Sequence, residues 1–366
     1  MDGSLSSRLH AATAYINRIG TAVPPNDVHQ AFIDFAGSLL PDVRSRRLFG
    51  RMAERAAITH RYSHLRPNPP DTPSLDETGF YRRGAFPGTA ARMRLYEQQA
   101  TGLALQAIDA LAIDPADITH LIVASCTGFS APGLDQLIQS RLGLPSCVER
   151  TLIGFMGCYA AVPALRAARH IVRSEPDARV LVVNLELCTL HLQETGDLET
   201  VLSFLLFGDA AAAALVTAEP YGIALDRFRA ATVPGTAELI TWRIGDLGFD
   251  MHLSGHVPAA IAAALRAERA RNDGDGILGR EPVEEVAHWA VHAGGRTVLD
   301  AVEQGFELPG AALSHSRSVL RDVGNVSSAT LPFVLSRLLA QGEKGPGMAM
   351  AFGPGLAAET FRFSLV

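Results

Sequence analysis

The stretch TLIGFMGCYAAVPALRAARHIV, residues 151–172, indicates the fold and contains the strongest candidate nucleophile. An apolar run ends at Gly157 and Cys158, and a helical pattern follows at once. Its apolar face consists of Ala161, Leu165, Ala168 and Val172. A thiol at the start of a helix faces unpaired N–H groups and the positive end of the helix dipole, which lower its pKa. We interpret Cys158 as a nucleophile at a strand–helix junction that Gly157 allows to turn tightly; the alternative is a buried structural cysteine.

The same alternation of buried strand and amphipathic helix extends in both directions from this stretch. Strand-like runs occupy 120–125, 180–187, 211–216, 286–293, 348–355 and 359–366. Helical patterns occupy 95–111, 159–172, 256–271, 297–306 and 328–341. Residues 65–90 are rich in Pro, Gly and charge, which predicts an irregular excursion. The alternation predicts an α/β protein with mostly parallel sheets, divided near residues 219–222 into halves 1–221 and 222–366.

Composition excludes several classes of protein. The 366 residues are 48% hydrophobic and 19% charged, which suits a large two-lobed core and excludes a disordered chain. A net charge of −6 argues against nucleic acid as the main partner. Four cysteines are too few for a disulfide framework, and the N-terminus lacks a signal-peptide pattern. No apolar run spans a membrane, so we expect a cytoplasmic protein without stable membrane insertion.

Several familiar motifs are missing. The chain has no GxGxxG after a strand, no GxxxxGK[ST] and no GxSxG, which argues against nicotinamide, P-loop and serine-hydrolase chemistry. Three HxxxH pairs occur, at His60/His64, His252/His256 and His288/His292, but none has the glutamate of HExxH. We therefore expect neither a metal site nor a cofactor.

A thiolate nucleophile needs an imidazole partner, and carbanion chemistry needs hydrogen-bond donors for the enolate oxygen. His292 lies at the end of a strand-like run, before two glycines, and Asn325 lies in a turn before an amphipathic helix. A satisfied core histidine and an ordinary turn asparagine are the plain alternatives. The presence of three such residues, each at the end of a strand or helix, favours an active site.

With these residues the chain resembles a type III polyketide synthase, the chalcone-synthase-like branch of the thiolase superfamily. The motifs that carry the resemblance are GFMGCYA (154–160), LLFGDAAAA (205–213), WAVHAGGRTVLD (289–300), LRDVGNVSSAT (320–330) and AFGPGLAAE (351–359). The resemblance implies a five-layered αβαβα fold with two similar halves and a homodimer. It implies that Cys158 accepts the acyl group. It also implies that His292 and Asn325 hold the thioester carbonyl and promote malonyl decarboxylation.

The resemblance also implies the surroundings of the site. Phe207 matches a gating phenylalanine, and Met251 stands where the family has a second one. Arg51 and Arg55 match positions that contact CoA phosphates, although a solvated helix face is the alternative. The implied cavity positions are Cys126, Thr127, Cys188, His191 and Ser327.

The function implied is condensation of an acyl-CoA starter, of aliphatic type, with malonyl-CoA, followed by cyclisation to a resorcinol, pyrone or phloroglucinol. The run ELCTLHL (186–192) is similar to bacterial alkylresorcinol and alkylpyrone synthases. Two alternatives stay open: a condensing enzyme like ketoacyl-ACP synthase III, and a non-catalytic thiolase-fold partner subunit.

Overall fold

The structure, a computed structural model, describes residues 12–271, 274, 276–279 and 282–366. Residues 1–11, which include most of the N-terminal stretch searched for a signal peptide, lie outside this range. The strands are β1 (Ala14–Ala22), β2 (Asn26–Asp27), β3 (Tyr62–Ser63), β4 (His120–Ser125), β5 (Glu149–Gly154), β6 (Val180–Leu187), β7 (Asp209–Thr217), β8 (Ile223–Thr232), β9 (Ile240–Gly245), β10 (Gly248–Leu253), β11 (His288–Val291), β12 (Gly345–Gly353) and β13 (Ala357–Leu365). The helices are α1 (His29–Leu39), α2 (Val43–Arg55), α3 (Thr89–Asp109), α4 (Leu134–Leu142), α5 (Ala161–Ser174), α6 (Leu198–Phe204), α7 (Val257–Arg269), α8 (Arg296–Phe306), α9 (Ser314–Val323) and α10 (Thr330–Gln341).

One nine-stranded sheet runs through the molecule in the order β11-β12-β13-β8-β1-β7-β6-β4-β5. Strands β4, β6 and β7 are buried on both faces, as their continuous apolar runs predict, whereas the edge strand β5 and much of β8 are exposed. In β6, Val180 and Val182 pack toward α5 and α10, whereas Leu181 and Val183 pack toward α3. In the other half, β12 likewise divides its side chains between the α5–α10 side and the α7–α8 side.

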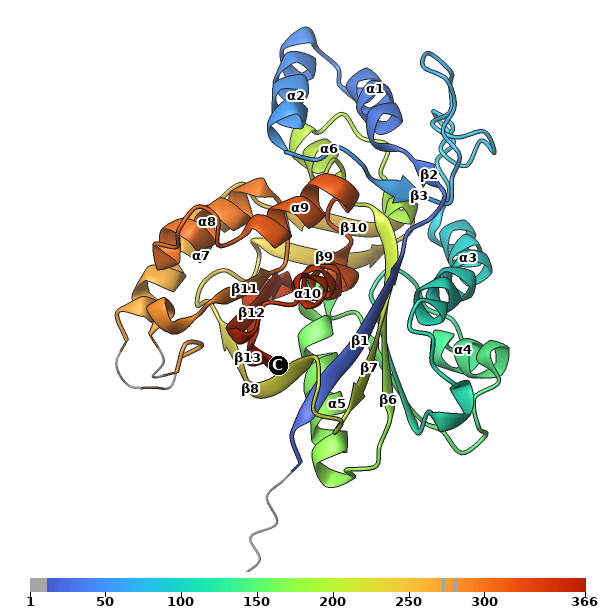
Figure 1. Cartoon of the computed structure of the whole chain (residues 1–366). Helices are drawn as coiled ribbons and strands as arrows, with labels where there is room; N and C mark the ends of the chain where they lie inside the picture. Colours follow the sequence, from blue (N-terminus) through green and yellow to red (C-terminus); the bar gives the residue numbers. More distant parts are fainter. Residues whose placement is uncertain (1–11, 272–273, 275, 280–281) are drawn as a thin grey trace, which may run out of the picture.

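This division of side chains places the helices in layers. Helices α3 and α4 cover one outer face and α7 and α8 the other, with α5 and α10 between the two halves of the sheet (Figure 1). The prediction of an α/β fold with a thiolase-like arrangement is therefore confirmed. The predicted runs 120–125 and 180–187 coincide with β4 and β6, and residues 65–90 form an irregular excursion before α3.

The expectation of mostly parallel sheets is wrong. Only β4–β5, β4–β6 and β11–β12 pair in parallel within the described part of the chain, and the other neighbours in the nine-stranded sheet are antiparallel. The short turn between β12 and β13, Pro354–Leu356, explains one of these pairings, since a tight turn returns the chain antiparallel. The connection from β7 to β8 is similarly short.

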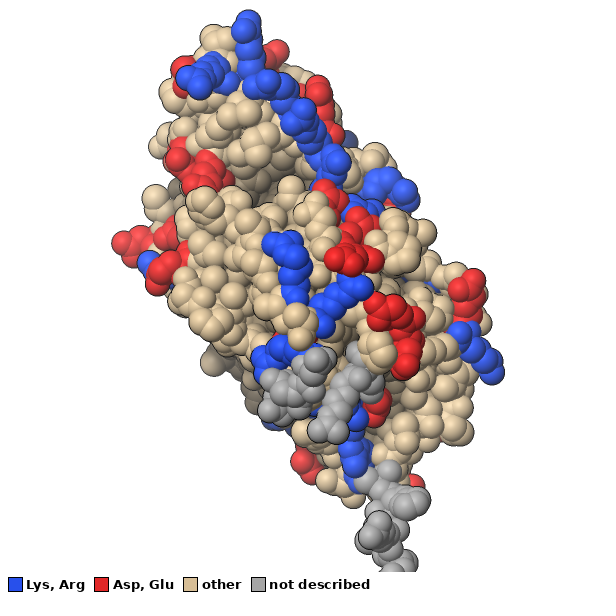
Figure 2. Space-filling model, turned by 90° about the vertical axis from the view of Figure 1, so that its left-hand side faces the viewer, with Lys and Arg blue, Asp and Glu red and all other residues tan. Residues whose placement is uncertain are grey.

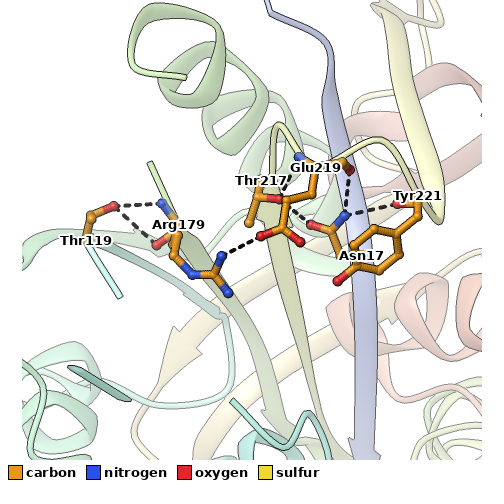
Figure 3. A network of polar contacts seen from close by, with 6 residues as sticks. All are labelled: Asn17, Thr119, Arg179, Thr217, Glu219 and Tyr221. Atoms are coloured by element: carbon orange, nitrogen blue, oxygen red, sulfur yellow. Dashed lines mark hydrogen bonds and ion pairs between the residues drawn. The ribbon is translucent and has the colours of Figure 1, made fainter. Parts of the chain in front are cut away.

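The turn between β7 and β8 is held by side chains of the N-terminal half. Asn17 of β1 donates to the carbonyl oxygens of Glu219 and Tyr221, at 2.9 and 3.0 Å, and accepts from Thr217 at 2.7 Å (Figure 3). The Glu219 carboxylate pairs with Arg179 at 2.7 Å. Since β1 pairs with both β7 and β8, these contacts fix the register of the strand that both halves share.

Candidate active site

Cys158 lies on a 3-10 turn, Gly157–Tyr159, which leads into α5. Gly157 has φ +76°, and a Cβ there would lie 2.6 Å from Cδ of Pro354, so this position requires glycine. Phe155 also has a positive φ, +57°, which is uncommon for a bulky residue. The chain therefore turns sharply twice to place the sulfur between β5 and α5, as the sequence pattern predicts.

The protonation state of the thiol differs from the expectation. Burial raises the pKa of Cys158 to about 11, and the polar side chains of Ser327 and Asn325 lower it by less than burial raises it. Removal from water disfavours the charged sulfur more than the donors around it favour it, which is opposite in direction to the lowered pKa that the helix start predicts. Burial thus favours a neutral Cys158 thiol at pH 7.

Asn325 is held rigidly at the end of α9. Its Oδ1 accepts from the backbone N–H of Ser327 at 2.9 Å, and its Nδ2 donates to the carbonyl of Gly294 at 3.2 Å. These bonds fix which side of the amide carries the donors. Ser327, next to it, has φ +48°, another strained conformation at the site. The amide therefore has an ordered N–H group close to the thiol.

His292 lies just after β11 and is almost fully buried. Its Nδ1 has no hydrogen-bond partner among the described residues. Burial lowers its pKa to about 3, so the imidazole is neutral at pH 7. A Cβ at Gly294 would lie 3.3 Å from Cδ2 and 3.4 Å from Nε2, so glycine lets the backbone approach the ring. The bond from Asn325 to the Gly294 carbonyl joins Asn325 to the turn that follows His292.

One pocket collects most of the predicted residues. Its lining includes seven positions singled out in the sequence: Cys126, Thr127, Cys158, Cys188, Phe207, Met251 and Ser327. Of the rest of the wall, Gly157 and Pro354 lie in motifs quoted from the sequence, and sequence reasoning missed Phe204, Ile240 and Trp242. Trp242 comes from β9, whose pattern gave no prediction, and its indole N–H donates to the carbonyl of Cys126 at 2.8 Å.

Sequence reasoning also missed Glu186, a fully buried carboxyl beside this pocket. Its Oε2 accepts from the backbone N–H of Cys126 at 3.0 Å and from the hydroxyl of Thr127 at 2.9 Å. Its Oε1 accepts from the hydroxyl of Ser328 at 2.5 Å. Burial raises the pKa of Glu186 to about 7. A charged residue inside the apolar run VLVVNLEL was the signal that could have identified it.

Comparison with known proteins supplies the family. The profile of chalcone and stilbene synthases, N-terminal domain, matches residues 3–220, and that of the C-terminal domain matches residues 225–366. The chain belongs to the chalcone and stilbene synthase family. It is a type III polyketide synthase, an acyltransferase of the class that catalyses decarboxylative condensation with CoA thioesters as substrates.

Relatives of the family span nearly the whole chain. It is 29% identical to the alpha-pyrone synthesis polyketide synthase-like Pks18 of Mycobacterium tuberculosis, over 96% of this chain and 91% of that protein. It is 32% identical to the bisdemethoxycurcumin synthase of Oryza sativa subsp. japonica, over 94% and 91%. The solved structure of PKS-I from Ectocarpus siliculosus matches with a TM-score of 0.84 at 29% identity, over 98% of this chain and 99% of that one.

Two other solved structures agree in fold. The C-terminal type III polyketide synthase domain of Steely1, from Dictyostelium, matches with a TM-score of 0.85 at 22% identity, over 97% of this chain and 99% of that chain. CsyB complexed with CoA-SH matches with a TM-score of 0.82 at 21% identity, over 96% and 100%. At these identities the likeness shows the thiolase-like fold alone.

Five predicted site residues are not part of the pocket lining: His292 and Asn325, described above, and His191, Arg51 and Arg55. His191 is fully buried outside its lining, with Nε2 at 2.7 Å from the Thr127 carbonyl and Nδ1 accepting from the Phe249 N–H at 3.0 Å. Burial lowers its pKa to about 3, so it is a neutral structural contact. Arg51 and Arg55 are exposed on α2, where they are available to an anion from solvent.

A second pocket adjoins the first and shares Cys188, Phe204 and Phe207 with it. Its other apolar walls come from Val28, Phe32, Leu65, Pro67, Leu75, Tyr81 and Leu192. The buried Arg61 holds the shared wall, because its guanidinium donates to the carbonyls of Phe204 and Phe207 at 2.9 and 2.8 Å. The two phenylalanines thus stand between two apolar spaces.

No described helix is both long and apolar enough to cross a bilayer. No group of three or more His, Cys, Asp or Glu side chains in the described ranges is placed to hold a metal ion.

Proposed function

We propose that this type III polyketide synthase loads an aliphatic acyl group from CoA onto Cys158, extends it with malonyl-CoA, and cyclises the product to a resorcinol, pyrone or phloroglucinol. The observation that carries the proposal is the pocket around the Cys158 thiol. Ser327, aromatic side chains and sulfur-containing side chains line this pocket, and Asn325 lies close to the Cys158 sulfur. We further propose a cytoplasmic homodimer that needs no metal or redox cofactor.

The starter is proposed to be aliphatic because of what surrounds the thiol. Both pockets are lined mainly by apolar side chains, and they meet at Phe204 and Phe207. An alkyl chain gains free energy for every methylene that leaves water, roughly 0.8 kcal/mol each. Met251, where the family has a phenylalanine, adds a flexible wall that adapts to such a chain. The CoA phosphates are proposed to contact Arg51 and Arg55 on α2, since guanidinium groups suit phosphate.

The first step is transfer of the acyl group. The Cys158 sulfur attacks the carbonyl carbon of the acyl-CoA thioester, and the bond between that carbon and the CoA sulfur breaks. Because the thiol is neutral, its proton has to leave as the sulfur attacks, and neutral His292 is the base that we propose for it. The departing CoA sulfur then takes this proton.

The second step is decarboxylative condensation. Malonyl-CoA loses its carboxylate as CO₂, and the electron pair of the broken bond forms an enolate whose charge lies on the thioester oxygen. The Asn325 amide and a ring N–H of His292 are proposed to donate hydrogen bonds to that oxygen. The enolate carbon then attacks the acyl–Cys158 carbonyl, and the Cys158 sulfur leaves. Donors fixed in advance in a water-poor site stabilise such charge most strongly.

The experiment that tests the proposal is incubation with a panel of acyl-CoAs and labelled malonyl-CoA, without any carrier protein, followed by product analysis. Cys158→Ala is expected to abolish both the acyl-enzyme and every extended product, whereas Cys147→Ala, at an exposed position, leaves both unchanged. Chain extension by Cys158→Ala at the wild-type rate would overturn the assignment. A requirement for a carrier-bound malonyl group would favour chemistry like that of ketoacyl-ACP synthase III instead.

A further inference from the structure

Helix α2, Val43–Arg55, presents a basic outer face at the edge of the molecule. Four exposed arginines lie on it: Arg44, Arg47, Arg51 and Arg55. At 3.6 residues per turn they fall within an arc of about 80°, opposite the buried Phe49 and Ala53. Figure 2 shows basic side chains gathered over the top of this face of the molecule, where α2 lies in Figure 1. The helix therefore directs one row of positive charge toward solvent.

These four arginines have few acidic residues as neighbours on the helix. Among the described residues none of the four forms an ion pair, and Glu54 is the only acidic residue within the helix. The surface beside them is unusually apolar, since Val43, Leu48 and Met52 are 54%, 37% and 42% exposed. Val43 also lines a shallow surface hollow with Arg44, Arg47 and Arg51. Unpaired charge flanked by exposed apolar side chains is typical of a surface that binds a partner.

The position of α2 connects this surface to the candidate active site. Its buried residues Phe49 and Ala53 pack in the same core cluster as Phe204 of α6, which lines both pockets. A partner bound along α2 would therefore lie near the element that shapes the acyl space. Two of the four arginines are also those proposed to contact CoA.

We propose that α2 is a docking surface for an acidic acyl carrier protein that delivers the starter; this rests on the proposed function of Cys158. Such a protein carries its acyl thioester on a pantetheine arm, the arm that also ends in the thiol of CoA. The Cys158 sulfur attacks the carrier-bound thioester carbonyl, the bond to the pantetheine sulfur breaks, and that sulfur leaves with the proton from Cys158. The step is thus the same exchange as with acyl-CoA.

The length of the basic row favours a protein over the nucleotide of CoA alone. Thirteen helical residues extend about 20 Å, and the row is flanked by apolar side chains that phosphates would not cover. A membrane fits less well, because an interfacial helix buries one continuous apolar face in the lipid. The continuous apolar face of α2 is already buried in the protein core.

The test compares three donors of one acyl group, chosen as the best starter in the CoA assays: acyl-CoA, acyl-pantetheine, and that acyl group on a purified acidic carrier protein of fatty acid synthesis. The paired variant Arg44→Glu/Arg47→Glu is expected to lower kcat/KM for the acyl carrier about tenfold more than it lowers kcat/KM for acyl-CoA, whose phosphates are proposed to contact only Arg51 and Arg55. Arg141→Glu, an exposed arginine on α4, is the matched control. Raising the salt concentration should reproduce the loss in the wild type.

The outcomes separate this proposal from the proposed function. If acyl-CoA is used but the wild-type protein takes the acyl group no better from the carrier than from acyl-pantetheine, the docking surface is refuted and the proposed function stands. If no donor acylates Cys158, the proposed function itself fails. If the paired variant instead loses binding to phosphatidylglycerol vesicles with no change toward the carrier, α2 is a membrane surface and the proposal is overturned.

Discussion

The backbone of Asn325 pairs with that of Phe207. The Asn325 N–H donates to the Leu206 carbonyl at 2.8 Å, and the Gly208 N–H donates to the Asn325 carbonyl at 3.0 Å. Phe207 belongs to the half of the sequence that contains Cys158, and Asn325 belongs to the half that contains His292. The bridge therefore ties the backbone of Asn325, the proposed enolate donor, to the wall of the pocket at Phe207.

Asn325→Asp tests the proposed donor with little change of shape. The carboxylate keeps an oxygen that can accept from Ser327 but loses the N–H groups. We expect decarboxylation of malonyl-CoA to fall about 10²–10³-fold, as when one oxyanion donor is removed. Release of labelled CO₂ measures this step, and the mass of the acyl-enzyme shows whether Cys158 is still loaded. Decarboxylation at the wild-type rate would remove Asn325 from the mechanism.

The neutral state of Cys158 predicts how its alkylation depends on pH. Since burial raises its pKa to about 11, the thiolate fraction should rise about tenfold for each pH unit between pH 7 and 10. Labelling with iodoacetamide, followed by peptide mass spectrometry at Cys158, measures this rise, with Cys158→Ala as the blank. A plateau in the labelling rate near pH 7 would mean that the thiolate is already formed, as the helix-start argument predicted.

Glu186→Gln should change how stability depends on pH. Burial raises the pKa of Glu186 from 4.5 to about 7, so the folded protein keeps this proton to a higher pH than the unfolded chain. Stability is therefore lost as the pH rises from about 4.5 to about 7, by an amount on the order of 3 kcal/mol. The variant keeps a neutral group at every pH and escapes this loss.

The measurement for Glu186 is the free energy of unfolding by denaturant at pH 5 and pH 8. The free energy of unfolding of the variant minus that of the wild type should be larger at pH 8 than at pH 5. A cost of mismatched hydrogen bonds that is the same at both pH values does not affect this comparison. Glu343→Gln, at an exposed position, should give no such change. A pH-independent difference for Glu186→Gln would contradict the raised pKa.

Phe204→Leu should widen the passage between the two pockets, because Phe204 lines both. We expect the preference among acyl-CoA starters to shift toward longer chains, measured as the ratio of kcat/KM values along an acyl series. Phe306→Leu, in the core of α8 away from both pockets, controls for general loss of packing. An unchanged ratio would show that the second pocket takes no part in starter binding.

Much of this architecture could be predicted because the local signals agree with the fold. The apolar runs of β4 and β6 and the face of α5 each demand burial, and the structure buries them. Strand direction could not be predicted, since an apolar run looks the same in parallel and antiparallel pairings. The direction of the Cys158 pKa shift could not be predicted, because the sequence shows the start of the helix but not how deeply the thiol is buried. Trp242 and Ile240 were not predicted as pocket residues, because β9 has no strong alternation of apolar and polar residues.

Strand β1 pairs with β7 on one side and with β8 on the other, so this one strand joins the two parts of the sheet. A chain cut between β7 and β8 would give two fragments, of which the second has lost the neighbour of its first strand. Such a fragment exposes a row of unpaired backbone groups that favours self-association. Neither fragment should therefore be active alone, and mixing them should restore turnover only as the severed edge is repaired, which makes this enzyme a natural candidate for split-protein complementation.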